Sequence, residues 1–319
     1  MTPSPKTASI PRDPTAPGRA AVVRRRVDGV LLLDKPIGLS SNAALQRAKR
    51  LYRAEKAGHT GTLDPLATGL LPICFGEATK FAQALLAADK RYLATVRFGA
   101  TTSTGDAGGA IVATRAVAAS RDDVEAALPH FIGRVPQVPP RYAALKHQGR
   151  KYYEYARKGV EIPRAAREVE IHELELRSWK APDAELAIRC GKGTYIRALA
   201  EDVGAALGCG AHLASLRRTA TGGFSLDQAT SLEALEPLSE PERDVLLLPV
   251  DALVGGLQRL DLEGAEAIRF RQGQRLERRD LSDGLLRIYA GGAFAGIAAA
   301  AAGVLKPQRL MTDGRWSLR

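Results

Sequence analysis

Cysteine, aromatic residues and long apolar runs are all scarce in this sequence. It has three cysteines in 319 residues, Cys74, Cys190 and Cys209, and their number and spacing match neither a disulfide framework nor a metal site. No stretch approaches the roughly 20 apolar residues that a membrane-spanning helix needs. The N-terminus also lacks the hydrophobic core of a signal peptide. We therefore predict a cytoplasmic protein with free thiols and no membrane association.

Positive charge is abundant and unevenly distributed. The net charge is +11, and residues 1–26 hold six Lys or Arg against one acidic residue. Residues 130–170 hold nine basic and four acidic side chains, and residues 257–319 hold eleven and seven. Several separate basic regions suit a polyanionic partner such as a nucleic acid. A surface charge that only favours solubility is the alternative that composition leaves open.

Composition also divides the chain into parts. Residues 1–26 are rich in Pro, Ala, Thr and Arg and show no apolar periodicity, which predicts a disordered basic tail. The rest is long enough for two domains, and Gly255-Gly256 marks the boundary between them. We therefore predict a main domain over residues 27–253 and a small domain over residues 258–319.

Apolar periodicity predicts both helices and strands. The expected helices span residues 41–54, 77–88, 122–131 and 195–207. The expected strands span residues 29–36, 70–75, 90–98, 111–113, 169–176, 185–190, 211–218, 285–289 and 291–297.

The stretch from Gly58 to Pro72 reads GHTGTLDPLATGLLP and fits no regular element. Its three glycines and two prolines break a helix, and its apolar residues do not alternate as in a strand. Pro65 restricts the backbone of Asp64, so a lone carboxylate lies on a stiff, glycine-flanked loop. Such a group suits a nucleophile or a general base. The alternative is an Asx-turn, in which Asp64 only caps its own backbone.

Other residues also fit either a site or ordinary structure. Tyr92 lies on the expected strand 90–98, where it either lines a site or packs in the core. Arg197 falls in the first turn of an expected helix, where a cation is unfavourable, so we expect a carboxylate partner. Residues 136–167 interleave tyrosines with Lys and Arg, which can stack bases and neutralise phosphates together. A solvated amphipathic helix at residues 150–158 is the alternative there.

The loop sequence closely resembles the catalytic motif of the TruB family of tRNA pseudouridine synthases, G-H-T-G-x-L-D-P-L-A-T-G. Residues 58–69 match every fixed position of that motif. The resemblance covers residues 27–224 well and the C-terminal part only loosely. Further segments resemble the family in the same order, namely residues 29–36, 76–81, 90–92, 142–146, 152–157, 192–197 and 216–218.

The resemblance implies an α+β fold. Its catalytic domain has a central mixed, mainly antiparallel sheet flanked by helices, and a small PUA-like β-domain follows. An insertion at about residues 130–170 is implied to grip the T arm of tRNA. The implied reaction converts uridine 55 of the T loop to pseudouridine by base flipping, without metal or cofactor. No obligate protein partner is implied, and we expect a monomer.

The resemblance also assigns roles to residues. Asp64 is the implied nucleophile, and attack at the sugar C1′ and at the base C6 both stay open. Arg197 is expected to keep Asp64 ionised and oriented. Tyr92 is implied to lie beside the target base, and we expect it to act as the base that removes the proton from C5. The expected substrate-binding residues are His59, Tyr195, Leu216, Lys35, Tyr142 and Lys146. For Lys35, a phosphate contact and a plain surface charge are both open, and the resemblance favours a structural role near the active cleft.

Two other functions remain as alternatives. The first is an RNA-binding or RNA-folding protein without enzymatic activity, which would use the basic insertion and the small domain. The intact set of Asp64, Tyr92, Tyr195 and Arg197 argues against it. The second is a hydrolase in which Asp64 belongs to a carboxylate pair, which is disfavoured because no second acid lies in a comparable rigid motif.

Overall fold

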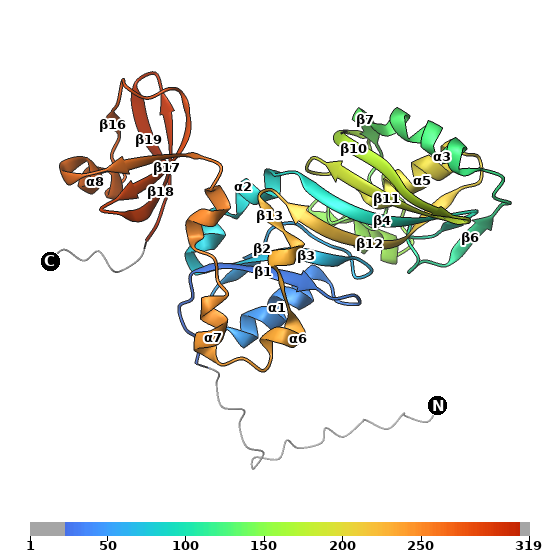
Figure 1. Cartoon of the computed structure of the whole chain (residues 1–319), viewed down its shortest axis with the longest axis horizontal. Coiled ribbons are helices and arrows are strands. Elements are labelled where there is room, and N and C mark those ends of the chain that lie inside the picture. Colours follow the sequence, from blue (N-terminus) through green and yellow to red (C-terminus); the bar gives the residue numbers. More distant parts are fainter. Residues whose placement is uncertain (1–22, 313–319) are drawn as a thin grey trace, which may run out of the picture.

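A computed structural model describes residues 23–312 of the chain (Figure 1). The tail predicted at residues 1–26 lies largely outside the described residues. Its boundary is wrong by a few residues, because Arg25 contacts the folded chain. The Arg25 guanidinium binds the Asp244 carboxylate, with Nη1 2.7 Å from Oδ2, and Arg25 also pairs with Ala54 in an isolated β-bridge.

A ten-stranded sheet forms the body of the molecule. Its strands are β1 (Gly29–Lys35), β2 (Ala57–His59), β3 (Thr68–Phe75), β4 (Lys90–Phe98), β7 (Gly133–Gln137), β10 (Arg167–Lys180), β11 (Asp183–Cys190), β12 (Ala211–Thr221), β13 (Phe224–Ser225) and β14 (Thr230–Ser231). The main path runs β14-β1-β3-β12-β4-β11-β10-β7, with β2 beside β3 and β13 beside β12. The pairs β1–β14 and β3–β12 are parallel and the others are antiparallel. The sheet is therefore mixed and mainly antiparallel, as predicted.

Short helices accompany the sheet. The α-helices are α1 (Ser41–Leu51), α2 (Ala82–Ala87), α3 (Arg121–Ala127), α4 (Tyr152–Arg157), α5 (Ile196–Ala206), α6 (Leu232–Leu235), α7 (Glu240–Val245) and α8 (Gly264–Arg271), and the 3₁₀ helices are η1 (Gly76–Lys80), η2 (Leu128–Phe131), η3 (Leu226–Gln228) and η4 (Val250–Val254). The helix predicted over residues 77–88 is divided into η1 and α2 at Phe81, whose side chain turns into the core. The helix predicted over residues 122–131 ends early, because Pro129 cannot donate the next helical hydrogen bond.

Both faces of the sheet carry apolar side chains, because successive residues of a strand point to opposite sides. Leu31 and Leu33 of β1 pack in the same core cluster as α1 and α5. Val30 and Leu32 lie in a second cluster with α2 and η4. The helices α1 and α5 thus pack into the same core cluster.

A smaller five-stranded sheet forms the C-terminal domain. Its strands are β15 (Gln258–Leu262), β16 (Leu276–Glu277), β17 (Gly284–Ala290), β18 (Ala293–Ala301) and β19 (Val304–Leu310), in the order β15-β17-β18-β19-β16. It has its own core and lies at one end of the molecule (Figure 1). Phe294 packs on Phe81 with ring centroids 5.2 Å apart, and Tyr289 is hydrogen-bonded to Asp251. The two sheets are thus joined by a packed interface.

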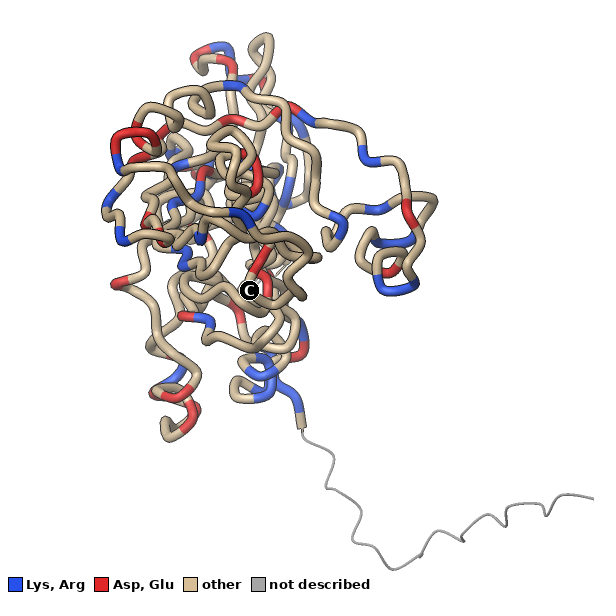
Figure 2. The backbone as a smooth tube through the Cα atoms, turned by 90° about the vertical axis from the view of Figure 1, so that its right-hand side faces the viewer, with Lys and Arg blue, Asp and Glu red and all other residues tan. Residues whose placement is uncertain are grey.

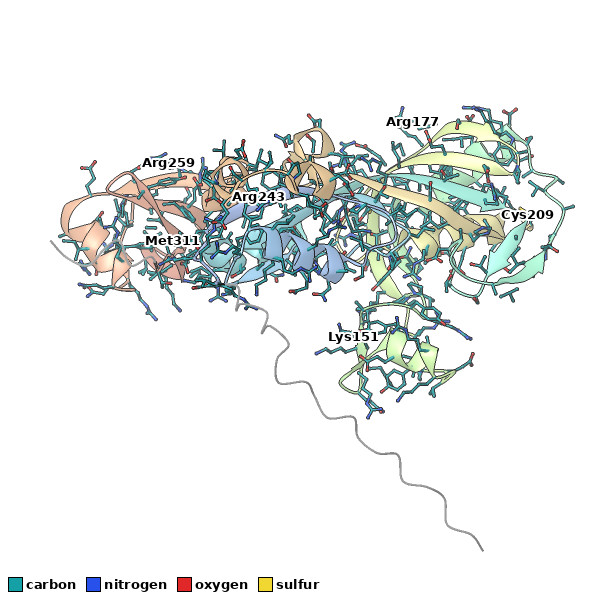
Figure 3. All side chains as sticks on the ribbon, turned by 90° about the horizontal axis from the view of Figure 1, so that it is seen from below. Lys151, Arg177, Cys209, Arg243, Arg259 and Met311 are labelled. Atoms are coloured by element: carbon teal, nitrogen blue, oxygen red, sulfur yellow. The ribbon has the colours of Figure 1, made fainter. Side chains whose placement is uncertain are left out.

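The basic insertion leaves the large sheet between β7 and β10. These strands pair with each other, with Gln137 opposite Arg167, so the excursion spans residues 138–166 and is shorter than the predicted 130–170. It contains β8 (Lys146–His147), β9 (Arg150–Lys151) and α4. Figure 3 shows the insertion, marked by Lys151, projecting away from the sheet. In Figure 2 the insertion is the lobe at the right of the view, and Lys and Arg lie along it. A second excursion is the hairpin of β5 (Ala100–Thr102) and β6 (Ile111–Thr114).

Candidate active site

The segment from Gly58 to Pro72 forms a loop between two strands. Our expectation of no regular element is wrong at both ends, where the segment belongs to β2 and β3, and right for residues 60–67. Asp64 begins a turn closed by the hydrogen bond from Ala67 N to the Asp64 carbonyl, at 3.0 Å. The buried Ser41 hydroxyl accepts from Leu63 N at 2.7 Å and donates to the Leu63 carbonyl at 2.9 Å. The backbone next to Asp64 is therefore held firmly by the start of α1.

The Asp64 carboxylate pairs with Arg197, the second residue of α5. Oδ2 of Asp64 lies 2.9 Å from Nε of Arg197. The arginine is buried, with Nη1 donating to the Thr104 carbonyl at 3.0 Å and Nη2 to the Tyr142 carbonyl at 2.8 Å. The Asp64 side chain is 38% exposed, whereas that of Arg197 is 5% exposed. The buried arginine thus orients the Asp64 carboxylate on one side, and the other side is open to solvent. The structure favours this arrangement over the Asx-turn.

A second carboxylate, Asp106, shares this arginine. Its Oδ2 lies 3.8 Å from Nε of Arg197, and its side chain is 13% exposed. Its Oδ1 accepts from the Thr104 hydroxyl at 2.6 Å and from Gly108 N at 3.0 Å. Asp106 is therefore a fixed negative charge behind Asp64. Asp106 was not predicted from the sequence, because no local pattern marks it.

The charge of Asp64 reflects opposing effects. Burial raises the pKa of its carboxyl above the ordinary value, and the charge of Asp106 raises it further. Arg197 and Lys35 lower it, with Arg197 acting through both its charge and its hydrogen bond. The expectation that Arg197 favours ionisation is correct in direction, but burial outweighs it. A carboxylate with a raised pKa is more basic and more nucleophilic when ionised.

Lys35 lies behind the loop and not on its surface. It is fully buried, and its Nζ donates to the Pro36 carbonyl at 2.8 Å and to the Leu39 carbonyl at 2.6 Å. Burial lowers its pKa to about 8, and the charge of Asp64 acts in the opposite direction. The prediction that Lys35 binds substrate is not supported by this position. Lys35 instead holds the turn before α1 and places a positive charge near Asp64.

Tyr92 and Arg218 face each other across β4 and β12. Burial raises the pKa of the Tyr92 phenol, whereas the Arg218 guanidinium beside it lowers it. Arg218 is 1% exposed and donates through Nη2 to the Gly61 carbonyl at 3.2 Å. Arg218 thus connects the tyrosine strand to the loop that carries Asp64.

The remaining predicted residues divide into two groups. His59, Tyr195 and Leu216 lie around the loop. Nδ1 of His59 is buried without a hydrogen-bond partner among the described residues, and burial lowers the pKa of its imidazole. Tyr195 immediately precedes α5 and is close enough to Asp64 and Arg197 for their charges to affect its phenol. Leu216 is buried and lies opposite Ala94 where β12 pairs with β4. It belongs to the core cluster against which Tyr92 packs.

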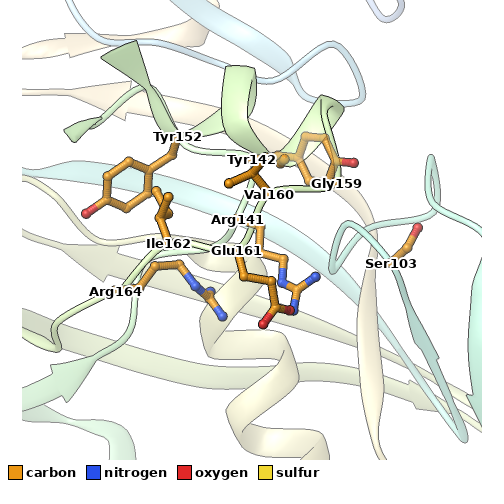
Figure 4. A pocket seen from close by; sticks show the side chains of 10 residues that line it. Ser103, Arg141, Tyr142, Tyr152, Gly159, Val160, Glu161, Ile162 and Arg164 are labelled. Carbon is orange, nitrogen blue, oxygen red and sulfur yellow. The ribbon is translucent and has the colours of Figure 1, made fainter. Parts of the chain in front are cut away.

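Tyr142 and Lys146 belong to the insertion. The Tyr142 carbonyl binds Arg197, whereas Lys146 is exposed on β8. A hollow between the insertion and the β5–β6 hairpin is shown in Figure 4. It is lined by Ser103, Arg141, Tyr142, Tyr152, Ala156, Gly159, Val160, Glu161, Ile162 and Arg164. Asp64 does not line it, so this hollow lies beside the site and does not contain the carboxylate.

Two negative findings apply to residues 23–312. No cluster of three or more His, Cys, Asp or Glu side chains in this range is placed to hold a metal ion. No helix in the same range has the length and apolar character to cross a membrane.

The chain is similar to one protein family along most of its length. Residues 49–196 match the family described as TruB family pseudouridylate synthase, N-terminal domain. Residues 197–255 match a tRNA pseudouridylate synthase B C-terminal domain, and residues 259–311 match the description "Pseudouridine synthase II TruB, C-terminal".

Similar proteins carry related names. The tRNA pseudouridine synthase B of Burkholderia mallei (strain ATCC 23344) is 53% identical over 308 residues, which cover 94% of this chain and 99% of the relative. The same enzyme of Thiobacillus denitrificans (strain ATCC 25259 / T1) is 55% identical over 289 residues, 90% of this chain and 97% of the relative. A crystal structure of a Cbf5-Nop10-Gar1 complex matches with a TM-score of 0.68 and 24% identity, covering 88% of this chain and 84% of that chain. This last likeness concerns the fold alone.

Proposed function

Because the chain belongs to the TruB family of pseudouridylate synthases, we propose that it isomerises uridine 55 in the T loop of tRNA to pseudouridine. Relatives more than half identical to it are named for action on tRNA. The observation that carries the proposal is the pair of Asp64 and Arg197, with 2.9 Å between Oδ2 and Nε and one side of the carboxylate open. This pair supplies an oriented nucleophile at the surface.

The reaction moves one glycosidic bond within a nucleotide. The bond from N1 to the sugar C1′ breaks, C5 forms a new bond to C1′, the C5 proton leaves and N1 takes up a proton. The target base must first leave the RNA stack. Asp64 attacks either C1′, displacing N1, or C6 of the base. Its bond to C1′ is then broken when C5 attacks that carbon, or its bond to C6 is broken when the C5 proton leaves, so the carboxylate is regenerated. Arg197 orients the carboxylate before attack and pairs with it again after release. No external water or redox partner enters this balance, so the proposed reaction needs neither metal nor cofactor.

The surrounding side chains fit the needs of a flipped base. Tyr92, Tyr195 and Leu216 provide aromatic and apolar walls, and an aromatic face can stack on a base. His59, whose buried Nδ1 has no hydrogen-bond partner among the described residues, helps to hold the flipped-out conformation of the RNA. Burial raises the pKa of Tyr92, so its role in accepting the C5 proton depends on Arg218, which lowers that pKa.

The basic parts outside the site are proposed to hold the tRNA. In the insertion, Lys151 lies 5.5 Å and Arg157 5.3 Å from the centre of the Tyr153 ring, so charge and an aromatic face are presented together. Such surfaces bind phosphates and stack bases. We propose that the insertion grips the T arm, that the C-terminal domain adds affinity, and that the protein acts as a monomer.

The test uses an unmodified tRNA transcript and the full chain. The wild-type protein should form pseudouridine at position 55, mapped by chemical modification and primer extension. Asp64→Asn should abolish turnover and keep most of the RNA affinity, because contacts to phosphates dominate binding. Activity of Asp64→Asn within tenfold of wild type would remove Asp64 as the nucleophile. If pseudouridine formed only at another position of the tRNA, the proposed target nucleotide would be wrong.

A further inference from the structure

The insertion is joined to the active site by a buried side chain that the reaction itself does not use. Gln137 is the last residue of β7, opposite Arg167 at the start of β10, and it is 3% exposed. Its Oε1 accepts from Tyr195 N at 2.8 Å, and its Nε2 donates to the Tyr195 carbonyl at 3.1 Å. One amide group thus binds both backbone polar groups of the residue immediately before α5.

This contact lies next to the catalytic arginine in the chain. Tyr195 is the N-cap of α5, and its carbonyl also accepts the helical hydrogen bond from Leu199 N at 3.1 Å. Arg197 follows two residues later, so a shift of Tyr195 moves the first turn of the helix and the guanidinium with it. Five residues beyond Gln137, the Tyr142 carbonyl binds Nη2 of the same arginine at 2.8 Å. Gln137 at the end of β7 and Tyr142 in the insertion therefore hold the Tyr195–Arg197 segment at two points.

We propose that Gln137 is a positioning residue for the reaction, acting through Tyr195 and Arg197. The end of β7, where the insertion begins, would thereby set the orientation of Asp64. The inference rests on the proposed function, because it assigns the RNA-binding insertion a part in the chemistry. Misplacing a catalytic group by about 1 Å can reduce a rate by roughly 100-fold. Gln137 touches neither the substrate nor the reacting atoms, and its effect reaches them through the arginine.

Two substitutions separate this role from a loss of stability. Gln137→Met has a similar length and leaves both backbone groups of Tyr195 without their amide partner. Gln137→Glu keeps the shape and the acceptor for Tyr195 N, but its ionised form has no donor for the carbonyl. The matched control is Tyr52→Phe, which removes a buried hydroxyl that donates to the Arg243 carbonyl at 2.8 Å, away from the insertion.

The measurements are the single-turnover rate with saturating tRNA, the tRNA dissociation constant and the melting temperature. Gln137→Met should lower the rate roughly 10- to 100-fold. Its tRNA affinity should stay within about threefold of wild type, because the exposed Lys and Arg of the insertion remain. Tyr52→Phe should lower the melting temperature and leave the rate unchanged.

Gln137→Glu adds a pH signature. A buried carboxyl tends to take up a proton, and its protonated form regains a donor for the Tyr195 carbonyl. The ratio of the variant rate to the wild-type rate should therefore rise as the pH falls, and this variant carries the test if Gln137→Met does not fold. A folded Gln137→Met with the wild-type rate, or a Gln137→Glu ratio independent of pH, overturns this inference alone. A wild-type protein that forms no pseudouridine overturns the proposed function and the inference with it.

Discussion

Arg218 passes behind the catalytic loop and donates its Nε to the carbonyl oxygen of Leu70 at 2.6 Å. The backbones touch closely here, because Gly69 pairs with Arg218 in parallel register between β3 and β12. Gly69 has φ +100°, and a Cβ at this position would lie 2.3 Å from the Arg218 carbonyl oxygen. The glycine therefore allows the strand that follows the Asp64 loop to approach the strand that carries Arg218.

Gly69→Ala should destabilise the protein strongly. The substitution combines a strained backbone with a backbone clash, and together these should cost about 3 kcal/mol or more. Gly208→Ala is the matched control, because Gly208 also has a positive φ, +74°, but no atom within 4 Å of an added Cβ. Its expected cost is about 1 to 2 kcal/mol. Urea unfolding of the two variants measures the difference, and equal losses would contradict the close approach at Gly69.

Arg197→Met should move the acidic limb of the pH–rate profile to higher pH. The reaction needs ionised Asp64, and Arg197 lowers the pKa of that carboxyl through charge and hydrogen bonding. Without it, burial and Asp106 raise the pKa further, so more alkaline conditions are needed to ionise Asp64. Arg197→Lys should recover only part of the rate, because an ammonium lacks the planar fork that also binds Thr104 and Tyr142. Single-turnover profiles that keep the wild-type acidic limb would exclude Arg197 from this role.

Asp106→Asn should shift the same limb in the opposite direction. The charge of Asp106 raises the pKa of Asp64, and a neutral amide removes that repulsion. The amide oxygen can still accept from Gly108 N and from the Thr104 hydroxyl, so the loop should keep its shape. The limb should therefore move to lower pH, whatever happens to the maximal rate. A shift to higher pH would show that Asp106 acts mainly by holding Arg197.

The C-terminal domain should contribute charge to tRNA binding. Arg275, Arg279 and Lys306 are exposed on it, and replacing all three by Gln should weaken binding and reduce the slope of log K against log salt by up to about three. The single-turnover rate at saturating tRNA should change little.

The control for that experiment removes the same net charge elsewhere. Arg97, Arg121 and Arg177 lie on the large domain and pair with Asp183, Glu125 and Glu175. Their triple replacement by Gln should affect the slope less, because these arginines already have carboxylate partners. Equal effects of the two triple variants would assign the C-terminal domain another role.

Local patterns predicted much of the fold. β1 and β4 were readable from apolar runs and alternation, and α1 from its Ser40 cap, whose hydroxyl accepts from Ala43 N at 3.1 Å. The division of residues 77–88 into η1 and α2 was not readable. It falls at Phe81, which packs against Phe294 of the other domain, a contact that no local pattern indicates.

The candidate site was predictable only where its signal is local. Asp64 stands out because it precedes Pro65 in a short segment that also holds three glycines. Lys35 was predicted to bind substrate, but the carbonyls of the following turn bind its ammonium and leave it buried. Arg218 lies in a segment that resembles the family, but no role was predicted for it, and Asp106 and Gln137 were not singled out. The roles of all three come from contacts with residues far away in the chain.

The sequence by itself determined that a carboxylate lies on a stiff turn, because Pro65 fixes its own φ and restricts the backbone of Asp64 before it. Only the tertiary structure decided how that carboxylate is charged and oriented. Arg197, Asp106 and Lys35 reach Asp64 from α5, from the β5–β6 hairpin and from β1, and burial adds to their effects. The physical reason is that desolvation and Coulomb interactions depend on distance through space, whereas backbone stiffness depends on neighbours along the chain.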